Sequence, residues 1–197
     1  KDSGAKAMII IENFASTLAQ VIERTPVRHV VLTSIGDMLG GVKGALVNSV
    51  VKYVKKLVPP FQLPQAVRFN QALAQGKHMT LLEANPGPED IAVLQYTGGT
   101  TGVSKGAVLL HRNIIANLLQ SEAWNSPLWK QIPDGEQPVM VCALPLYHIF
   151  GFTINLMFGL RVGARNILIP NPRDITATLK ALKGKLFHSF PAVNTLF

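Results

Sequence analysis

The sequence contains a single cysteine, Cys142, among its 197 residues. A disulfide needs two cysteines, so this chain forms no internal disulfide framework, and its cysteine usage suits a reducing compartment. Acidic residues are also scarce: 11 Asp and Glu stand against 19 Lys and Arg, which gives a net charge of +8. Such an excess is typical of proteins that bind polyphosphates, anionic lipids or nucleic acids. No basic stretch with interleaved aromatic residues accompanies the charge, so we do not expect a nucleic-acid partner.

Long apolar runs are missing as well. The longest one, residues 149–160, is interrupted by Gly151 and Asn155 and is shorter than the ~20 residues of a membrane-spanning helix. The sequence shows no secretory signal, internal repeat or low-complexity tract, and its first residue is Lys1 rather than methionine. We therefore expect a cytoplasmic protein and interpret the chain as one part of a longer protein.

Short apolar runs that alternate with helical spacing predict an α/β fold. A β-rich run at 7–11, helical spacing over 14–24 and a second buried run at 29–33 form a strand–helix–strand unit, which predicts parallel pairing. Further strands are predicted at 91–96, 107–110, 139–144, 166–170 and 186–190, and helices at 114–124, 152–160 and 175–182. The predicted fold class is therefore α/β, with a mostly parallel sheet and flanking helices.

The pattern changes over residues 34–88, which contain clustered prolines, glycine-bearing turns and a basic helix at about 42–58. One face of this helix is apolar and is formed by Leu46, Val47, Val50, Val51, Val54 and Leu57. Lys52, Lys55 and Lys56 share the opposite face. Two interpretations stay open: a packed surface helix with a solvated lysine face, or a peripheral contact with an anionic membrane.

The most informative stretch is 95–106, which reads Gln-Tyr-Thr-Gly-Gly-Thr-Thr-Gly-Val-Ser-Lys-Gly. Glycines allow successive backbone N–H groups to converge on a concave surface, and the hydroxyl groups add neutral donors. Lys105 adds one compact positive charge. A glycine-rich hairpin turn is the alternative interpretation, but the density of donors beside a lysine favours a polyphosphate-binding loop.

This stretch is not a Walker A loop. Aligned from Gly99, the pattern G-x-x-x-x-G-K-[ST] meets Ser104 in place of its second glycine and Gly106 in place of the Mg²⁺-binding hydroxyl. Residues 107–110 are apolar and predict a strand, whereas a Walker loop leads into a helix. We therefore predict a phosphate clamp between two strands.

A second informative stretch, 145–151, reads Pro-Leu-Tyr-His-Ile-Phe-Gly and follows the buried run 139–144. A histidine directly after a strand end lies where open α/β sheets bind ligands. On this evidence alone, His148 is more often a structural residue than a ligand-binding one. Cys142, in the preceding run, is most simply a small buried side chain.

Together the two stretches resemble the adenylate-forming enzymes, a superfamily of acyl-CoA synthetases, luciferases and peptide-synthetase adenylation domains. Residues 96–106 are similar to its phosphate-loop signature, with Ser104 where proline is common, and residues 147–151 resemble its aromatic–His–x–Phe–Gly motif. Within the superfamily the chain most resembles the bacterial long-chain fatty acid–CoA ligases, which also carry an insertion like 34–88. The resemblance implies that residues 1–197 are part of the large N-terminal domain, without the C-terminal domain.

The implied reaction activates a fatty acid with ATP to acyl-AMP and then forms a thioester with coenzyme A. The resemblance assigns catalytic roles to His148 and Lys105. Binding of ATP and its phosphates is assigned to Thr97, Gly98, Gly99, Thr100, Thr101, Gly102 and Lys105, with Thr100 near Mg²⁺. Contact with the acyl substrate is assigned to His148, Phe150 and Gly151.

The implied partners are fatty acid, ATP and coenzyme A, with the inner face of the cytoplasmic membrane and a second copy of the chain as further expected partners. In the family, the metal carboxylate, the ribose-binding aspartate and the adenylation lysine follow this region. We therefore expect residues 1–197 alone to be inactive. Two alternatives stay open: an adenylation domain for another carboxylic acid, and an isolated nucleotide- or lipid-binding module.

Overall fold

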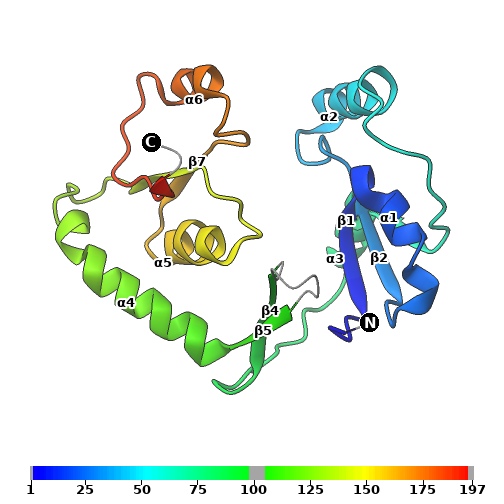
Figure 1. Ribbon diagram of the computed structural model, residues 1–197, viewed down its shortest axis with the longest axis horizontal. Helices are drawn as coiled ribbons and strands as arrows, with labels where there is room; N and C mark the ends of the chain where they lie inside the picture. Colours follow the sequence, from blue (N-terminus) through cyan, green and yellow to red (C-terminus); the bar gives the residue numbers. More distant parts are fainter. Residues whose placement is uncertain (1, 98–104, 195–197) are drawn as a thin grey trace. The chain divides into compact units, whose positions relative to one another are not determined.

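The computed structural model describes residues 2–97 and 105–194, and the chain divides into two compact units, Lys1–Ala84 and Asn85–Phe197. Each unit has β-structure and a hydrophobic core of its own (Figure 1). Among the described residues, two of the three sheets are parallel, and helices pack beside them. The predicted α/β class is confirmed, although the strands are distributed over separate sheets.

A three-stranded parallel sheet forms the first unit, in the order β1 (Ala7–Ile11), β2 (His29–Thr33) and β3 (Ala66–Arg68). The central strand, β2, pairs with both neighbours, so the predicted parallel pairing of the first two runs is confirmed. The sequence did not reveal β3 or the following helix α3 (Phe69–Gly76), because a three-residue strand carries too little periodicity.

The single helix predicted over 14–24 is wrong. The connection between β1 and β2 consists of three short pieces, η1 (Glu12–Phe14), α1 (Ala15–Ala19) and η2 (Ile22–Arg24). The backbone leaves the helical region at Val21, where φ is −125°, and a β-branched valine has a slightly lowered helix propensity. Ala15, Leu18 and Ile22 of this segment are nevertheless buried in the core of the unit, with Val30, Leu32 and Leu63, whereas Phe14 and Val21 are exposed.

The basic helix predicted at 42–58 forms, but its apolar face packs less than expected. It consists of α2 (Gly41–Ser49) and the π-helix η3 (Val50–Val54). Val51 is buried, whereas Leu46, Val54 and Leu57 are 65%, 73% and 52% exposed. The predicted apolar face is therefore packed only in part among the described residues, and the two interpretations of this helix both stay open.

Polar contacts attach α2 to the loop that follows β2. Asn48 Oδ1 accepts a hydrogen bond from the N–H of Gly36 at 2.7 Å, and Asn48 Nδ2 donates to Asp37 Oδ1 at 3.1 Å. Asp37 Oδ2 in turn accepts the N–H of Ser34 at 2.8 Å. The helix is thus held on one side by directional bonds, and its outer side remains exposed.

The second unit begins with an antiparallel hairpin of β4 (Ile91–Thr97) and β5 (Lys105–Leu110), which confirms the two predicted strands. The hairpin leads into α4 (His111–Trp129), the long green helix of Figure 1. This helix is longer than the predicted 114–124. Asn113 lies in its first turn, as the third helical residue, and Asn113 Oδ1 accepts the N–H of the N-cap residue Leu110 at 2.9 Å.

Two parallel strands, β6 (Val139–Cys142) and β7 (Arg165–Leu168), form the centre of this unit. Between them the chain forms the π-helix η4 (Gly151–Phe158) and a short α5 (Gly159–Arg161) where an α-helix was predicted at 152–160. Side chains of β6 alternate between two cores. Met140 packs on the side of α4 and η4, and Val139 and Val141 on the other.

The last predicted helix is confirmed as α6 (Ile175–Leu182), with Asp174 Oδ1 accepting the N–H of Ala177 at 2.9 Å. The strand predicted at 186–190 is wrong, since Ser189 forms only an isolated bridge with Met140. The ring of His188 accepts the Val139 N–H through Nδ1 at 3.0 Å and so replaces a backbone carbonyl.

Among the described residues, every helix is too short or too polar to span a lipid bilayer.

Candidate functional site

The end of the β4–β5 hairpin brings together two of the predicted phosphate-binding residues. Thr97 and Lys105 are direct cross-strand partners at the last pair of the ladder. The two residues come directly before and after residues 98–104 in the sequence, and Lys105 is exposed. The predicted phosphate-binding residues Gly98, Gly99, Thr100, Thr101 and Gly102 lie outside the described residues, so their roles stay predictions.

The cross-strand pair next to Thr97 and Lys105 gives a structural role to two further residues of the motif. Tyr96 is the cross-strand partner of Gly106, and its ring lies over this glycine. A Cβ added at Gly106 would come within 3.1 Å of Tyr96 Cζ. An aromatic ring that covers a strand glycine fixes the register of a hairpin, so this pair keeps Thr97 and Lys105 opposite each other.

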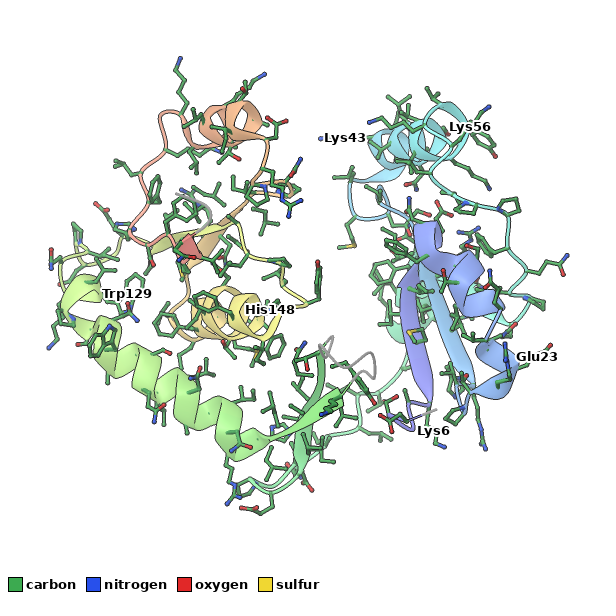
Figure 2. All side chains as sticks on the ribbon, in the orientation of Figure 1. Lys6, Glu23, Lys43, Lys56, Trp129 and His148 are labelled. Atoms are coloured by element: carbon green, nitrogen blue, oxygen red, sulfur yellow. The ribbon has the colours of Figure 1, made fainter. Side chains whose placement is uncertain are left out.

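The predicted acyl-site histidine lies in the turn between β6 and η4, where Figure 2 labels it at the start of the helix. The His148 N–H donates to the Pro145 carbonyl at 3.0 Å. His148 Nδ1 accepts the N–H of Phe150 at 3.2 Å. In the neutral ring the proton therefore resides on Nε2. The side chain is exposed, so Nε2–H is a donor available to a ligand.

The turn around His148 requires a glycine three residues later. Gly151 is buried, and a Cβ at this position would collide with the carbonyl group of Pro145. Phe150, between the two, is half-buried. Gly151 thus shapes the turn through its backbone, and the predicted acyl contacts of Phe150 and Gly151 stay predictions.

A contact that the sequence did not predict joins the two motifs. Gln95 of β4 directs its amide toward the turn before η4, where Nε2 donates to the Tyr147 carbonyl at 3.3 Å. The same amide donates to the Tyr96 carbonyl at 3.3 Å. The strand that precedes residues 98–104 is therefore linked to the residue beside His148. The only sequence signal was the position of Gln95 at the edge of the motif.

Metal-ligating side chains do not gather in the part of the chain that the structure describes. The described residues contain no group of three or more His, Cys, Asp or Glu side chains placed to hold a metal ion. Thr100, the residue predicted near Mg²⁺, lies outside them. The described part of the site therefore offers one cation, Lys105, and neutral donors as its means of attracting phosphate.

The lone cysteine lies close in sequence to the site but is not part of it. Cys142 is 4% exposed at the end of β6, and its Sγ lies 3.6 Å from the Leu144 carbonyl oxygen. Burial raises the pKa of its thiol by penalising the thiolate. A buried protonated thiol is a poor nucleophile, which agrees with the interpretation of Cys142 as a small core side chain.

The outer side of α2 and η3 forms a second candidate site in the first unit, which we call the basic apolar surface. It combines exposed apolar residues with exposed lysines, namely Val42, Lys43, Leu46, Lys52, Tyr53, Val54, Lys55, Lys56 and Leu57. Lys43 and Lys56 are labelled on this helix in Figure 2. The Lys52 ammonium lies 5.5 Å from the centre of the Tyr53 ring. The surface therefore presents positive charge and apolar area side by side.

Comparison with known proteins relates this chain to a family of enzymes. The sequence model of the family described as AMP-binding enzyme matches residues 1–197. A long-chain-fatty-acid–CoA ligase of Escherichia coli O157:H7 is 51% identical over 196 residues, which is all of this chain and 34% of the ligase. The ligase of the same name from Haemophilus influenzae is 49% identical over 198 residues and 35% of its length. The chain thus spans about a third of the relatives that it matches.

A solved structure agrees on the fold. The inhibitor-bound N-terminal domain of FACL13 from Mycobacterium tuberculosis superposes with a TM-score of 0.54 at 16% identity, over 96% of this chain and 44% of that domain. At this identity the likeness concerns the fold alone. It confirms the prediction that the chain folds like part of the N-terminal domain of an adenylate-forming enzyme.

Proposed function

The chain belongs to the AMP-binding enzyme family, and on that premise we propose that it forms the phosphate- and acyl-binding part of a long-chain fatty acid–CoA ligase. The intact ligase, meaning the protein of the relatives' length that carries residues 1–197, would convert fatty acid, ATP and coenzyme A into acyl-CoA, AMP and pyrophosphate. The proposal is supported by the similarity of this chain to ligases named for this reaction, which are 51% and 49% identical to it over its whole length.

One observation carries the assignment to this site. The Gln95 amide links the strand before the proposed phosphate loop to Tyr147, the neighbour of His148. Thr97 and Lys105 stand opposite each other at the end of the same hairpin. Donors suited to phosphate and a donor suited to an acyl oxygen therefore belong to one connected part of the second unit.

In the first half-reaction a carboxylate oxygen attacks the α-phosphorus of ATP, and the bond to the bridging oxygen breaks as pyrophosphate leaves with the electron pair. Negative charge increases on the phosphate oxygens during this step. The Lys105 ammonium and the donors of residues 97–102 would stabilise that charge, because preorganised donors act most strongly where charge develops. No covalent enzyme intermediate is needed.

In the second half-reaction the sulfur of coenzyme A attacks the acyl carbon, and AMP leaves as the thiol loses its proton. The Nε2–H of His148 is proposed to donate to an oxygen of the acyl-adenylate and so to orient it. Phe150 and Gly151 are proposed to shape the entrance for the acyl chain. Mg²⁺, when bound, would offset phosphate charge, and no step here depends on a ligand for it among the described residues.

Turnover assays on the intact ligase test this proposal. ATP, coenzyme A and a panel of carboxylic acids are supplied, and acyl-AMP, acyl-CoA and pyrophosphate are measured. Acyl-CoA formation from long-chain fatty acids supports the proposal. Turnover of amino or aryl acids alone would favour an adenylation domain of other specificity. Binding of ATP or lipid without any acyl-AMP would favour an isolated binding module.

We also propose a peripheral contact between the basic apolar surface and an anionic membrane. The observation that favours it is the exposure of Leu46, Val54 and Leu57 beside four lysines. An anionic lipid surface satisfies both features at once, since lysines pair with headgroups and apolar side chains enter the interface. A second copy of this chain is the competing partner, but it would bring another positively charged surface against the first.

A further inference from the structure

The helix that follows His148 carries a fully buried amide. Asn155 of η4 is 0% exposed. Its Nδ2 donates to the Val141 carbonyl of β6 at 3.1 Å and to Oδ1 of Asn166 in β7 at 3.2 Å. Asn166 Nδ2 donates back to the Asn155 carbonyl at 2.9 Å. Two asparagines thus attach the helix to both strands of the central sheet.

Packing does not account for an amide at this position. A buried amide is destabilising unless its polar atoms are hydrogen-bonded, and Asn155 Oδ1 has no partner among the described residues. A leucine has the same number of side-chain heavy atoms and the same branch point, and it would carry no unsatisfied oxygen of its own. The amide instead makes directional hydrogen bonds. These bonds fix the rotation of η4 and its height over β6 and β7, whereas apolar contacts alone would allow both to vary.

The orientation of His148 depends on that helix. The Phe152 N–H donates to the His148 carbonyl at 2.8 Å, in the first turn. The N–H of Phe150, at the N-cap of η4, is the group that holds His148 Nδ1. A change in the register of η4 would therefore move the donor that sets the tautomer and direction of the imidazole. Unusual π-helical turns are frequent at functional sites for this kind of reason.

We propose that Asn155, together with Asn166, is a positioning residue that holds η4 in its π-helical register and thereby aims His148 Nε2. The side chain of Asn155 extends from η4 to the sheet, and Asn155 acts on His148 only through the helix. The catalytic consequence rests on the proposed function, because it requires His148 to contact the acyl-adenylate. The structural consequence, a fixed tautomer of His148, does not depend on that function.

Three variants of the intact ligase test the inference. Asn155→Leu keeps the branched shape of the side chain and removes its two bonds, to the Val141 carbonyl and to Asn166 Oδ1. Thr153→Val is the matched control, because Thr153 is also buried in η4 but its hydroxyl bonds only to carbonyls of the same helical turn, Ile149 at 2.8 Å and Phe150 at 3.3 Å. Asn166→Asp keeps the acceptor for Asn155 and removes the return donor, so it is the milder variant.

Two measurements are made on each variant. Steady-state kinetics of the ligase reaction give kcat and KM, and nitrogen-15 chemical shifts in alkaline buffer report the tautomer of His148. For Asn155→Leu we expect a roughly 10²-fold lower kcat, the effect of a misplacement of about 1 Å, with KM for ATP unchanged. We also expect the shifts of the two ring nitrogens to move toward each other as the tautomers mix. Thr153→Val should keep the wild-type values of both.

Wild-type kcat and an unmixed tautomer in Asn155→Leu would overturn the inference, as would equal losses in Asn155→Leu and Thr153→Val. If Asn155→Leu does not fold, Asn166→Asp decides the question. A loss of kcat smaller than about 10²-fold, together with mixed tautomers of His148, supports the inference, and a wild-type kcat with a single tautomer contradicts it. If the wild-type ligase forms no acyl-AMP, the proposed function is wrong, and the tautomer of His148 still tests the positioning role.

Discussion

The Gln95 amide donates to the carbonyl of Tyr147 across 3.3 Å, although the two residues are 52 positions apart. One end of this contact belongs to the strand that precedes residues 98–104, and the other belongs to the turn that carries His148. Since the same amide also holds the Tyr96 carbonyl, it connects the backbones of both motifs. The contact makes the two motifs one structural element in the second unit.

We predict that Gln95→Glu slows adenylation by the intact ligase. The carboxylate has no hydrogen to donate and would repel the Tyr147 carbonyl. The loss should be up to about tenfold in kcat, since a net hydrogen bond contributes ~0.5–1.5 kcal/mol. Gln131→Glu is the matched control, because Gln131 Nε2 donates to the Pro127 carbonyl at 3.0 Å near the end of α4. Equal effects of the two variants would show that the Gln95 link has no role in the site.

A second prediction concerns the stability of the first unit. Glu12 is 4% exposed and pairs with Arg68 at 3.1 Å. Arg68→Ala would leave a buried carboxylate without its partner, and a group left unsatisfied in this way typically costs ~1–3 kcal/mol. Urea unfolding, followed by a probe in residues 1–84, should show this decrease in the free energy of unfolding.

Arg112→Ala, followed by a probe in the second unit to which Arg112 belongs, is the control for that measurement. Arg112 pairs with Glu89 at 3.0 Å, and both side chains are exposed. Exposed pairs typically contribute ~0–1 kcal/mol, so this variant should unfold nearly as the wild type does. A larger loss in Arg112→Ala than in Arg68→Ala would contradict the importance of burial at Glu12.

Cys142 should react slowly with alkylating reagents in the folded protein. Because burial raises the pKa of its thiol, the folded state binds the thiol proton more tightly than the unfolded state does. This contribution to stability is complete below the pKa of the unfolded thiol and is lost as the pH rises through the folded one. Iodoacetamide labelling across alkaline pH, with and without urea, checks the direction of the pKa shift. The folded protein should begin to react at a higher pH than the unfolded protein. Labelling at the same pH in both states would contradict it.

The membrane contact has its own test. Changing Lys52, Lys55 and Lys56 to Gln should weaken binding of the intact ligase to anionic vesicles by ~3 kcal/mol, about 1 kcal/mol for each lysine. Leu46→Ser with Val54→Ser should weaken it through the apolar side chains. The control changes three exposed lysines of the second unit, Lys180, Lys183 and Lys185. Unchanged co-sedimentation of the Lys52 triple variant would exclude the contact, and self-association without vesicle binding would favour a second copy as partner.

The sequence predicted the elements that depend on local patterns. The strands at 7–11 and 29–33 follow from continuous apolar runs, and the start of α6 follows from the capping side chain of Asp174. The ends of the proposed phosphate loop, Thr97 and Lys105, were predicted because glycine-rich loops between strands carry a dense local signal.

Contacts between distant residues were not predictable in the same way. Asn155 and Asn166 are two ordinary polar residues in sequence, and only the packing of η4 on β6 and β7 makes them partners. The same is true of His188, whose ring accepts the Val139 N–H where a backbone carbonyl would accept it in a regular strand pair. In each case a side chain satisfies a backbone group across the fold, which no local periodicity reveals.

The central claim is that Lys105 and its neighbours bind the phosphates of ATP in an adenylating enzyme. Separate measurement of the two half-reactions in Lys105→Ala of the intact ligase tests it most directly. Loss of one preorganised charge-stabilising donor should lower the rate of acyl-AMP formation by about 10²–10³, while thioester formation from supplied acyl-AMP and coenzyme A should fall far less. An equal loss in both half-reactions, or none in the first, would contradict the claim.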